Sequence, residues 1–294
     1  MFIGLASILA ALLGLISVVH STHYPGEFIA SPRAERAVST DPMLLVYASL
    51  AGLGLHNDDQ HELSLNGVPA MARTHWMRIA NAAVPEIMGN PCSPYHFGVA
   101  VVNTTSDELV CVAANSVSTT GNPSMHGEIT GLQRCTEVLS ERGLTPGEIL
   151  NAWKDLTMYT TGEPCPMCAS ALRWAGIGEV VWATSIETLI KGGYGQIYLP
   201  SSLIVSASYT LPHHTLWYGS VLANETDPYF SHLNNESAPC PEACERILRE
   251  GKRVTECVPT AEWTTEWEKR KGQWEKELME SKGHGHVRHT HDEL

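Results

Sequence analysis

Basic residues are scarce in this sequence. Its 294 residues include 19 Lys and Arg against 32 Asp and Glu, so the formal net charge at pH 7 is −13. There is no extended cluster of Lys and Arg, which is the electrostatic footprint that nucleic-acid binding normally needs. The composition therefore argues against a nucleic-acid partner, and we expect any substrate to be a small molecule. With 43% apolar residues, the chain has enough material for one α/β core with extensions.

Charge is absent altogether from residues 2–19, which form one apolar run. Such a run, followed by small residues around Ser21, is typical of a secretory signal peptide. We predict this peptide at residues 1–21. No Lys or Arg precedes the run, and its length lies at the lower edge of a membrane span, so an uncleaved anchor is the alternative.

Two further features indicate the secretory pathway. Residues 291–294 read His-Asp-Glu-Leu, a retention signal that predicts the endoplasmic reticulum lumen as location and a retention-signal receptor as partner. Three Asn-x-Ser/Thr sequons predict glycosylation at Asn103, Asn224 and Asn235. Sequons also arise by chance, so they support this location only weakly.

The most informative residues lie in two short stretches, 125–128 and 163–168. His126, Cys165 and Cys168 offer one imidazole and two thiolates, which leave the fourth position of a tetrahedral zinc ion open for water, as catalytic sites do. Glu128 lies two residues beyond the histidine, so it can reach that water without binding the metal. The residues therefore predict Zn²⁺ as cofactor and Glu128 as the catalytic acid–base.

The flanks of both stretches predict regular structure. Residues 129–135 place apolar side chains at helical spacing, so His126 and Glu128 fall at a helix N-terminus. Residues 156–161 are β-branched and aromatic, as in a strand, and 169–175 read as a helix with a proline in its first turn. Two helix N-termini would then converge on one ion, where their N–H groups favour the thiolates.

With these motifs the sequence resembles the cytidine and nucleobase deaminase superfamily, in the branch of yeast cytosine deaminase, bacterial guanine deaminase and tRNA adenosine deaminases. The pattern H-x-E…P-C-x-x-C is typical of zinc deaminases. Residues 126–129 followed by Cys135 are similar to the cytosine deaminase helix, and 159–168 combine a fungal cytosine deaminase-like strand with a guanine deaminase-like cysteine loop. A weaker block is 113–116. The resemblance covers about residues 70–230 and indicates a fungal-type member of the secretory pathway.

This resemblance implies a three-layer α/β/α fold with a mixed central sheet of about five strands. It implies a zinc-dependent hydrolytic deaminase that releases ammonia from a small aminated heterocycle, a free nucleobase or nucleoside of guanine, cytosine or adenine type. Asn115 would bond the ring carbonyl or a sugar, and the Gly127 backbone would lie beneath the ring. The Glu163 carbonyl would accept from the amino group, while the Glu163 side chain has no assigned role.

Two other classes of function stay open. The Cys-x-x-Cys stretch follows a strand and opens a helix, as in a thiol–disulfide oxidoreductase, but that class leaves His126 and Glu128 unexplained. A catalytically silent zinc-binding fold is the second alternative. Bound zinc that protects the two thiols would exclude the oxidoreductase. Release of ammonia would exclude the catalytically silent fold.

We predict four parts of the chain: the signal peptide (1–21), an N-terminal extension (22–69), the zinc deaminase domain (70–235) and a C-terminal helical extension with the retention signal (236–294). Expected helices are 43–55, 70–83 and a short one near 145–148, and expected strands are 97–102, 108–113, 179–183 and 203–205. The glycine-rich run 191–195 lacks the spacing of a Walker phosphate loop, so we interpret it as a flexible turn.

Six of the eight cysteines lie outside the zinc motif: Cys92, Cys111, Cys135, Cys240, Cys244 and Cys257. Their connectivity cannot be deduced from spacing. In an oxidising compartment the six could form three disulfides. For Cys111 and Cys135, on a core strand and a core helix, the plainer interpretation is buried free thiols, and we expect Cys257 to pair with Cys240 or Cys244.

Beyond them, Trp263, Trp267, Trp274 and Leu278 lie on one face of a predicted helix. That helix is expected to pack on the domain or on a second subunit, which would make a homodimer. Residues 284–291, which include several histidines, are interpreted as a flexible segment that exposes the retention signal.

Overall fold

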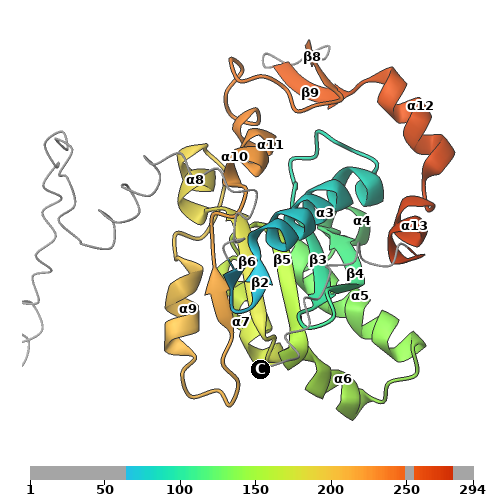
Figure 1. Ribbon diagram of the computed structural model, residues 1–294. Coiled ribbons are helices and arrows are strands. Elements are labelled where there is room, and N and C mark those ends of the chain that lie inside the picture. The colour runs from blue at the N-terminus through green and yellow to red at the C-terminus, as the bar shows by residue number, and fades with distance from the viewer. Residues whose placement is uncertain (1–63, 249–254, 281–294) are drawn as a thin grey trace, which may run out of the picture. The chain divides into compact units, whose positions relative to one another are not determined.

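The computed structural model describes residues 64–248 and 255–280 (Figure 1). The chain divides into two units, Met1–Gln60 and His61–Leu294. The predicted signal peptide, the expected helix at 43–55, the histidine-bearing tail and the retention signal all lie outside the described residues. None of the helices in the described part of the chain is long and apolar enough to cross a membrane.

The second unit is built on a five-stranded sheet with the order β4-β3-β5-β6-β7. The strands are β3 Gly98–Asn103, β4 Glu108–Ala114, β5 Leu156–Gly162, β6 Glu179–Thr184 and β7 Leu216–Tyr218. β3 pairs antiparallel with β4 and β5, whereas β5, β6 and β7 run parallel. The predicted mixed sheet of five strands is therefore confirmed.

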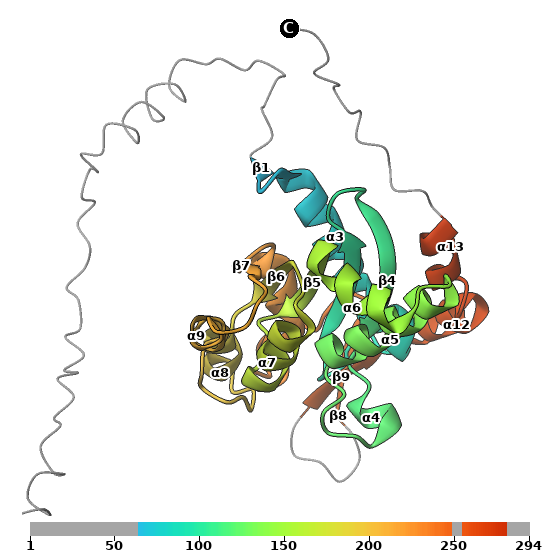
Figure 2. The same ribbon diagram turned by 90° about the horizontal axis from the view of Figure 1, so that it is seen from below.

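Helices cover both faces of this sheet. Helix α3 (Ala70–Met88) lies on one face, and α5 (Gly127–Glu141) and α7 (Pro166–Ala175) lie on the other (Figure 2). Strand β3 alternates accordingly, because Val99 and Val101 pack on the α5 and α7 side while Ala100 and Val102 pack on the α3 side. Both faces of the strand are buried, which confirms the three-layer α/β/α architecture.

The contact between α3 and β3 is close. A Cβ atom added to Gly98 would lie 2.1 Å from the carbonyl oxygen of Ala80, so only glycine fits there. The helix begins after Pro69 and ends at Gly89, whose φ of 69° gives the left-handed cap that glycine favours.

The remaining elements of the described residues are short. They are β1 Ser64–Leu65, β2 Val68–Pro69, α4 Val117–Thr120, α6 Pro146–Ala152, η1 Trp153–Asp155, α8 Ile186–Lys191, α9 Ser201–Ala207, α10 Ala223–Thr226, α11 Pro228–Ser231, β8 Cys244–Leu248, β9 Thr255–Pro259, α12 Ala261–Arg270 and α13 Trp274–Glu280. Helix α6 confirms the short helix expected near 145–148, and Thr145 and Glu148 form a capping box at its start.

The strand expected at 203–205 is wrong. These residues belong to α9, which follows Pro200 and packs against α7. A short apolar run does not distinguish a strand from a buried helix by its pattern alone. The fifth strand is β7 instead, where Leu216 to Tyr218 pair with Glu179 to Val181 of β6.

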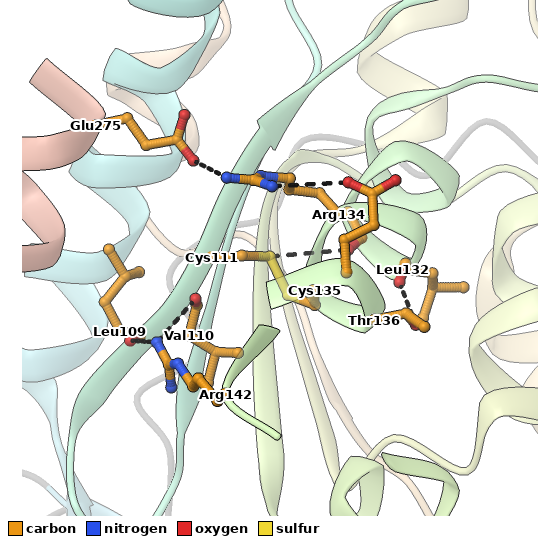
Figure 3. Close-up of a disulfide and its surroundings, with 11 residues drawn as sticks. Leu109, Val110, Cys111, Leu132, Arg134, Cys135, Thr136, Arg142 and Glu275 are labelled. Carbon is orange, nitrogen blue, oxygen red and sulfur yellow. Dashed lines mark hydrogen bonds and ion pairs between the residues drawn. A yellow bond between two sulfur atoms is a disulfide. The ribbon is translucent and has the colours of Figure 1, made fainter. Parts of the chain in front are cut away.

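The interpretation of Cys111 and Cys135 as free thiols is also wrong. The two form a disulfide between β4 and α5 (Figure 3), since the packing of helix on strand brings their Cα atoms to 5.3 Å, within the range of a disulfide. Below this bond, Arg142 of the cap of α5 donates to the carbonyl oxygens of Leu109 and Val110.

Two more disulfides hold the β8–β9 hairpin. Cys240 pairs with Cys257, one of the two pairings expected for Cys257, and Cys92 pairs with Cys244. Cys92 lies between α3 and β3, so the second bond ties the hairpin to the segment that leads into the central sheet.

The C-terminal segment forms two helices, not the single helix expected. They separate around Gly272, whose φ is 80°. The apolar face still packs on the domain. The Trp267 indole lies over Gly89 and donates to the carbonyl oxygen of Glu86 at 2.9 Å, and Trp274 and Leu278 join the core on the α3 side of the sheet.

Candidate active site

Two helix starts meet near the end of the central strand β5. His126 is the N-cap residue of α5, and Cys165 is the N-cap residue of α7, which places Cys168 in the first turn of that helix. The His126 Nδ1 atom lies 3.5 Å from the Cys165 sulfur. The predicted placement of both motif halves at helix N-termini is confirmed.

His126, Cys165 and Cys168 form a group whose three donor atoms all lie within 4.8 Å of one another. One imidazole nitrogen and two sulfur atoms make the donor set that tetrahedral zinc takes in catalytic sites, with a fourth position left for a water molecule. The hydrogen bond from Cys168 lowers the pKa of the Cys165 thiol to about 4, so Cys165 is a thiolate at neutral pH. The residues present therefore fit a zinc ion.

Glu128 is the second residue of α5 and is 3% exposed. It stands outside the group of three metal-binding side chains. Burial, with the Cys165 thiolate nearby, raises the pKa of the Glu128 carboxyl to about 7. A carboxyl group with such a pKa both accepts and donates a proton readily at neutral pH.

Glu128, His126 and Cys165 line a cavity of about 210 Å³, whereas Cys168 is not part of its walls. Its walls are formed by Tyr95, Phe97, Asn115, Val117, Pro123, His126, Glu128, Glu163, Cys165, Tyr194, Gly195 and Gln196. The rings of Phe97 and Tyr194 lie 5.6 Å apart, edge to face, and Phe230 packs behind both. The cavity walls therefore combine aromatic side chains with a carboxylate and residues of the metal-binding group.

Asn115 is buried at the end of β4, where its backbone N–H donates to the carbonyl oxygen of Phe97 at 2.8 Å. Its side-chain oxygen accepts from the backbone N–H of Val117 at 3.1 Å. Asn115 is one of the residues that line the cavity, and an amide NH₂ group is a donor that suits a ring carbonyl.

Gly127 has a packing reason for lacking a side chain. A Cβ atom there would lie 2.6 Å from the carbonyl oxygen of Phe97. Glycine therefore lets α5 start close to Phe97, the aromatic residue that precedes β3. Its backbone contact with a substrate ring stays a prediction.

Residues 71–184 match the cytidine and deoxycytidylate deaminase zinc-binding region. This deaminase region contains α5, β5, α7 and β6 and every residue of the metal-binding group.

Three curated relatives are similar to part of this chain. Guanine deaminase of Bacillus subtilis is 27% identical over 103 residues, which are 35% of this chain and 59% of the relative. A probable cytosine deaminase of Schizosaccharomyces pombe is 30% identical over 38% of this chain and 64% of its own length. A tRNA-specific adenosine deaminase 2 of Danio rerio is 30% identical over 47% of this chain and 58% of its own length. The chain therefore spans about three fifths of the relatives it matches.

Among solved structures, a guanine deaminase from Nitrosomonas europaea superposes with a TM-score of 0.42 and 18% identity, over 57% of this chain and 85% of that chain. The three curated relatives carry the names of nucleobase and tRNA deaminases.

Several of the residues that line the cavity beside the metal-binding group were not predicted from the sequence. Tyr194 comes from the run 191–195 that was interpreted only as a flexible turn, and Gln196 directly follows that run. Tyr95 and Phe97 come from the segment before β3. A glycine-rich run directly after a parallel strand and a short helix was the one signal available, because loops at strand ends commonly carry binding residues. None of residues 211–230 lines this cavity, and Phe230 packs against Phe97 in its wall.

The three sequons are described by the structure. Asn224 and Asn235 are exposed, and Asn103 is half-buried with its side-chain oxygen accepting from Thr105 and Ser106 N–H groups. Glycosylation at these positions stays a prediction.

Proposed function

We propose that this chain is a zinc-dependent hydrolytic deaminase that releases ammonia from a small aminated heterocycle, a free nucleobase or nucleoside. The observation that carries the proposal is the buried Glu128 carboxyl beside the His126, Cys165 and Cys168 group, inside an aromatic cavity. The similarity of residues 71–184 to the deaminase zinc-binding region supports it.

Zinc held by His126, Cys165 and Cys168 would supply Lewis-acid activation of water at neutral pH. Glu128 accepts the proton that the attacking water loses as its oxygen bonds to the amidine carbon of the ring. It gives this proton to the ring nitrogen, then takes a second proton from the hydroxyl on the tetrahedral carbon and gives it to the amino group. The carbonyl forms as the carbon–nitrogen bond breaks and ammonia leaves.

The other cavity residues bind and orient the ring. Phe97 and Tyr194 offer aromatic faces and edges to a flat heterocycle and exclude water from the cavity. The Asn115 NH₂ group donates to the ring carbonyl, and the Glu163 carbonyl accepts from the amino group that leaves. These contacts fix which carbon of the ring faces Glu128.

The cavity favours a free base or nucleoside over a phosphorylated or polymeric substrate. None of the described residues that line it is Lys or Arg, and the whole chain is strongly acidic. A phosphate group would find no cationic partner in the cavity, and tRNA would meet electrostatic repulsion. Cytosine, guanine and adenine types all present the amidine carbon that the mechanism needs.

The geometry argues against the oxidoreductase alternative. Cys165 and Cys168 are both buried, and they are the free cysteines of the described residues while the other six form disulfides. A redox pair needs an accessible thiolate to attack its partner. Three disulfides are typical of an oxidising compartment, and they support the proposed location in the endoplasmic reticulum lumen.

Ammonia release from a panel of aminated bases, nucleosides and nucleotides, with tRNA at low salt as comparison, tests the function. We expect turnover of one or more free bases or nucleosides, lost after zinc is chelated and regained when zinc is added back. Turnover of tRNA alone would contradict the small-molecule assignment. A zinc-loaded protein that releases no ammonia from any substrate would favour the catalytically silent fold.

A further inference from the structure

The Glu163 side chain holds together two segments that are distant in sequence. One carboxylate oxygen accepts from the backbone N–H and the hydroxyl of Ser201, at 2.8 and 2.7 Å, and the other accepts from the backbone N–H of Ile186 at 2.9 Å. Glu163 is 7% exposed, and Ser201 and Ile186 are more deeply buried still. We infer that Glu163 is a positioning residue that fixes residues 186–201 as one wall of the active-site cavity, an inference that rests on the proposed function.

The segment between the two anchors supplies this wall. It contains Tyr194, Gly195 and Gln196, all of which line the cavity. Within it, the backbone N–H of Tyr194 donates to the carbonyl oxygen of Leu189, and Leu189 is buried beside Phe97 and Phe230. Fixing the start and the end of the segment therefore fixes the aromatic ring that faces Phe97.

A carboxylate suits this position better than any neutral side chain. Each of its two oxygens accepts from an N–H group, and no Lys or Arg pairs with it among the described residues. A buried carboxylate is stable only with such donors. A glutamine in its place would turn an NH₂ group towards one of the two N–H groups, so one anchor would be lost.

Ser201 extends the connection to the sheet. Its hydroxyl donates to Glu163 and accepts from the Trp217 indole N–H at 2.9 Å, and Trp217 lies in β7. The backbone of Glu163 is itself bonded to β6, since its N–H donates to the carbonyl oxygen of Thr184 at 2.7 Å. The wall is thus fixed to two strands of the sheet through one carboxylate.

The catalytic groups lie on other elements. Glu128 and His126 belong to the start of α5, and the two cysteines to the start of α7. Loosening residues 186–201 should therefore weaken contacts that the substrate makes equally in the ground state and the transition state. Such a loss raises KM and leaves kcat nearly unchanged.

The test compares Glu163→Gln with Glu187→Gln. Glu187 lies in the same segment, but its exposed side chain pairs only with Lys191. In Glu163→Gln we expect amide hydrogen exchange at Ile186 or Ser201 to rise about tenfold or more, the effect of losing a hydrogen bond to a buried charged group. We also expect KM to rise about tenfold, kcat to stay within about threefold and zinc content to be unchanged. Glu187→Gln should match the wild type in all four.

A milder variant, Ser201→Ala, removes the hydroxyl and keeps both backbone donors, so it should change exchange and KM in the same direction and by less. Unchanged exchange across 186–201 in Glu163→Gln overturns the inference, as does a fall in kcat and zinc content with KM unaltered. If the wild-type protein deaminates no substrate, the proposed function fails, and the exchange measurements still decide the role of Glu163.

Discussion

The His126 imidazole nitrogen lies 3.5 Å from the Cys165 sulfur, although the two residues are 39 positions apart. Each is the residue that precedes the first turn of its helix. Both helices pack on the same face of the sheet, so their starts meet at one end of the strands. The arrangement of the metal-binding group is therefore a consequence of the sheet order, not of local sequence.

The first prediction concerns this group. Cys165→Ser should reduce bound zinc from about one ion per chain to a small fraction and abolish deamination, because a serine hydroxyl is a poor ligand beside the remaining imidazole and thiolate. Metal analysis of the purified variant measures this directly. A wild-type protein that is metal-free as isolated and has a Cys165–Cys168 disulfide would contradict the zinc assignment.

The second prediction separates catalysis from folding. Glu128→Gln keeps the size and hydrogen bonding of the buried side chain but cannot transfer a proton, so turnover should fall by ~10²–10⁴. Zinc content and thermal stability should change little. Glu137→Gln, on the exposed side of the same helix, is the matched control and should keep full activity. Equal activity of the Glu128 variant and the wild type would refute the assigned role.

The sequence was sufficient to predict an element wherever its local residue pattern agrees with the tertiary structure. Strand β3 followed from an apolar run buried on both faces, and the placement of His126 and Cys165 followed from the helices that begin beside them. Strand β7 could not be found, because Leu216 to Tyr218 are defined by pairing with β6 and not by their own burial. The Cys111–Cys135 bond depends on how close α5 packs to β4, and the spacing of cysteines in the sequence does not give that distance.

A third prediction concerns the bond that ties the hairpin to the sheet. Cys92 and Cys244 are 152 residues apart, whereas Cys240 and Cys257 are 17 apart. The chain-entropy account makes the loss in free energy of unfolding about 5 kcal/mol when the first pair is replaced by alanine and about 3 kcal/mol for the second pair. Denaturant unfolding of both double variants measures the difference. A larger loss for the short-range pair would contradict this account.

A fourth prediction concerns location. The apolar run at 2–19 and the His-Asp-Glu-Leu sequence at 291–294 lead us to expect a glycosylated protein retained in the endoplasmic reticulum, with its mature N-terminus near residue 22. Deleting residues 291–294 should release it into the medium. A truncated protein that stays with the cells and still begins at Met1 would favour the membrane anchor instead.

The fifth prediction concerns stability in acid and depends on His96. Its imidazole is fully buried, bonded through Nε2 to the Asn81 side-chain oxygen at 2.8 Å and stacked on Tyr229 at 3.8 Å. Burial, with His232 nearby, lowers the pKa of His96 to about 3. The Nδ1 atom is buried without a partner, so a proton there would be neither solvated nor bonded.

Because the pKa of His96 is lower in the folded protein than in the unfolded chain, the unfolded chain takes up this proton first as the pH falls. The contribution of His96 is fully present above pH ~6.5 and is lost progressively between pH ~6.5 and ~3, by about 2 kcal/mol at pH 5. Denaturant unfolding of the wild type and His96→Gln from pH 7.5 to 4.5 should give a steeper loss of stability in the wild type, whatever the stability of the variant at pH 7.5. Parallel curves would show that His96 is already solvated in the folded protein. The other titrating groups, His232 among them, are common to both proteins, so the difference between the two slopes isolates the buried imidazole.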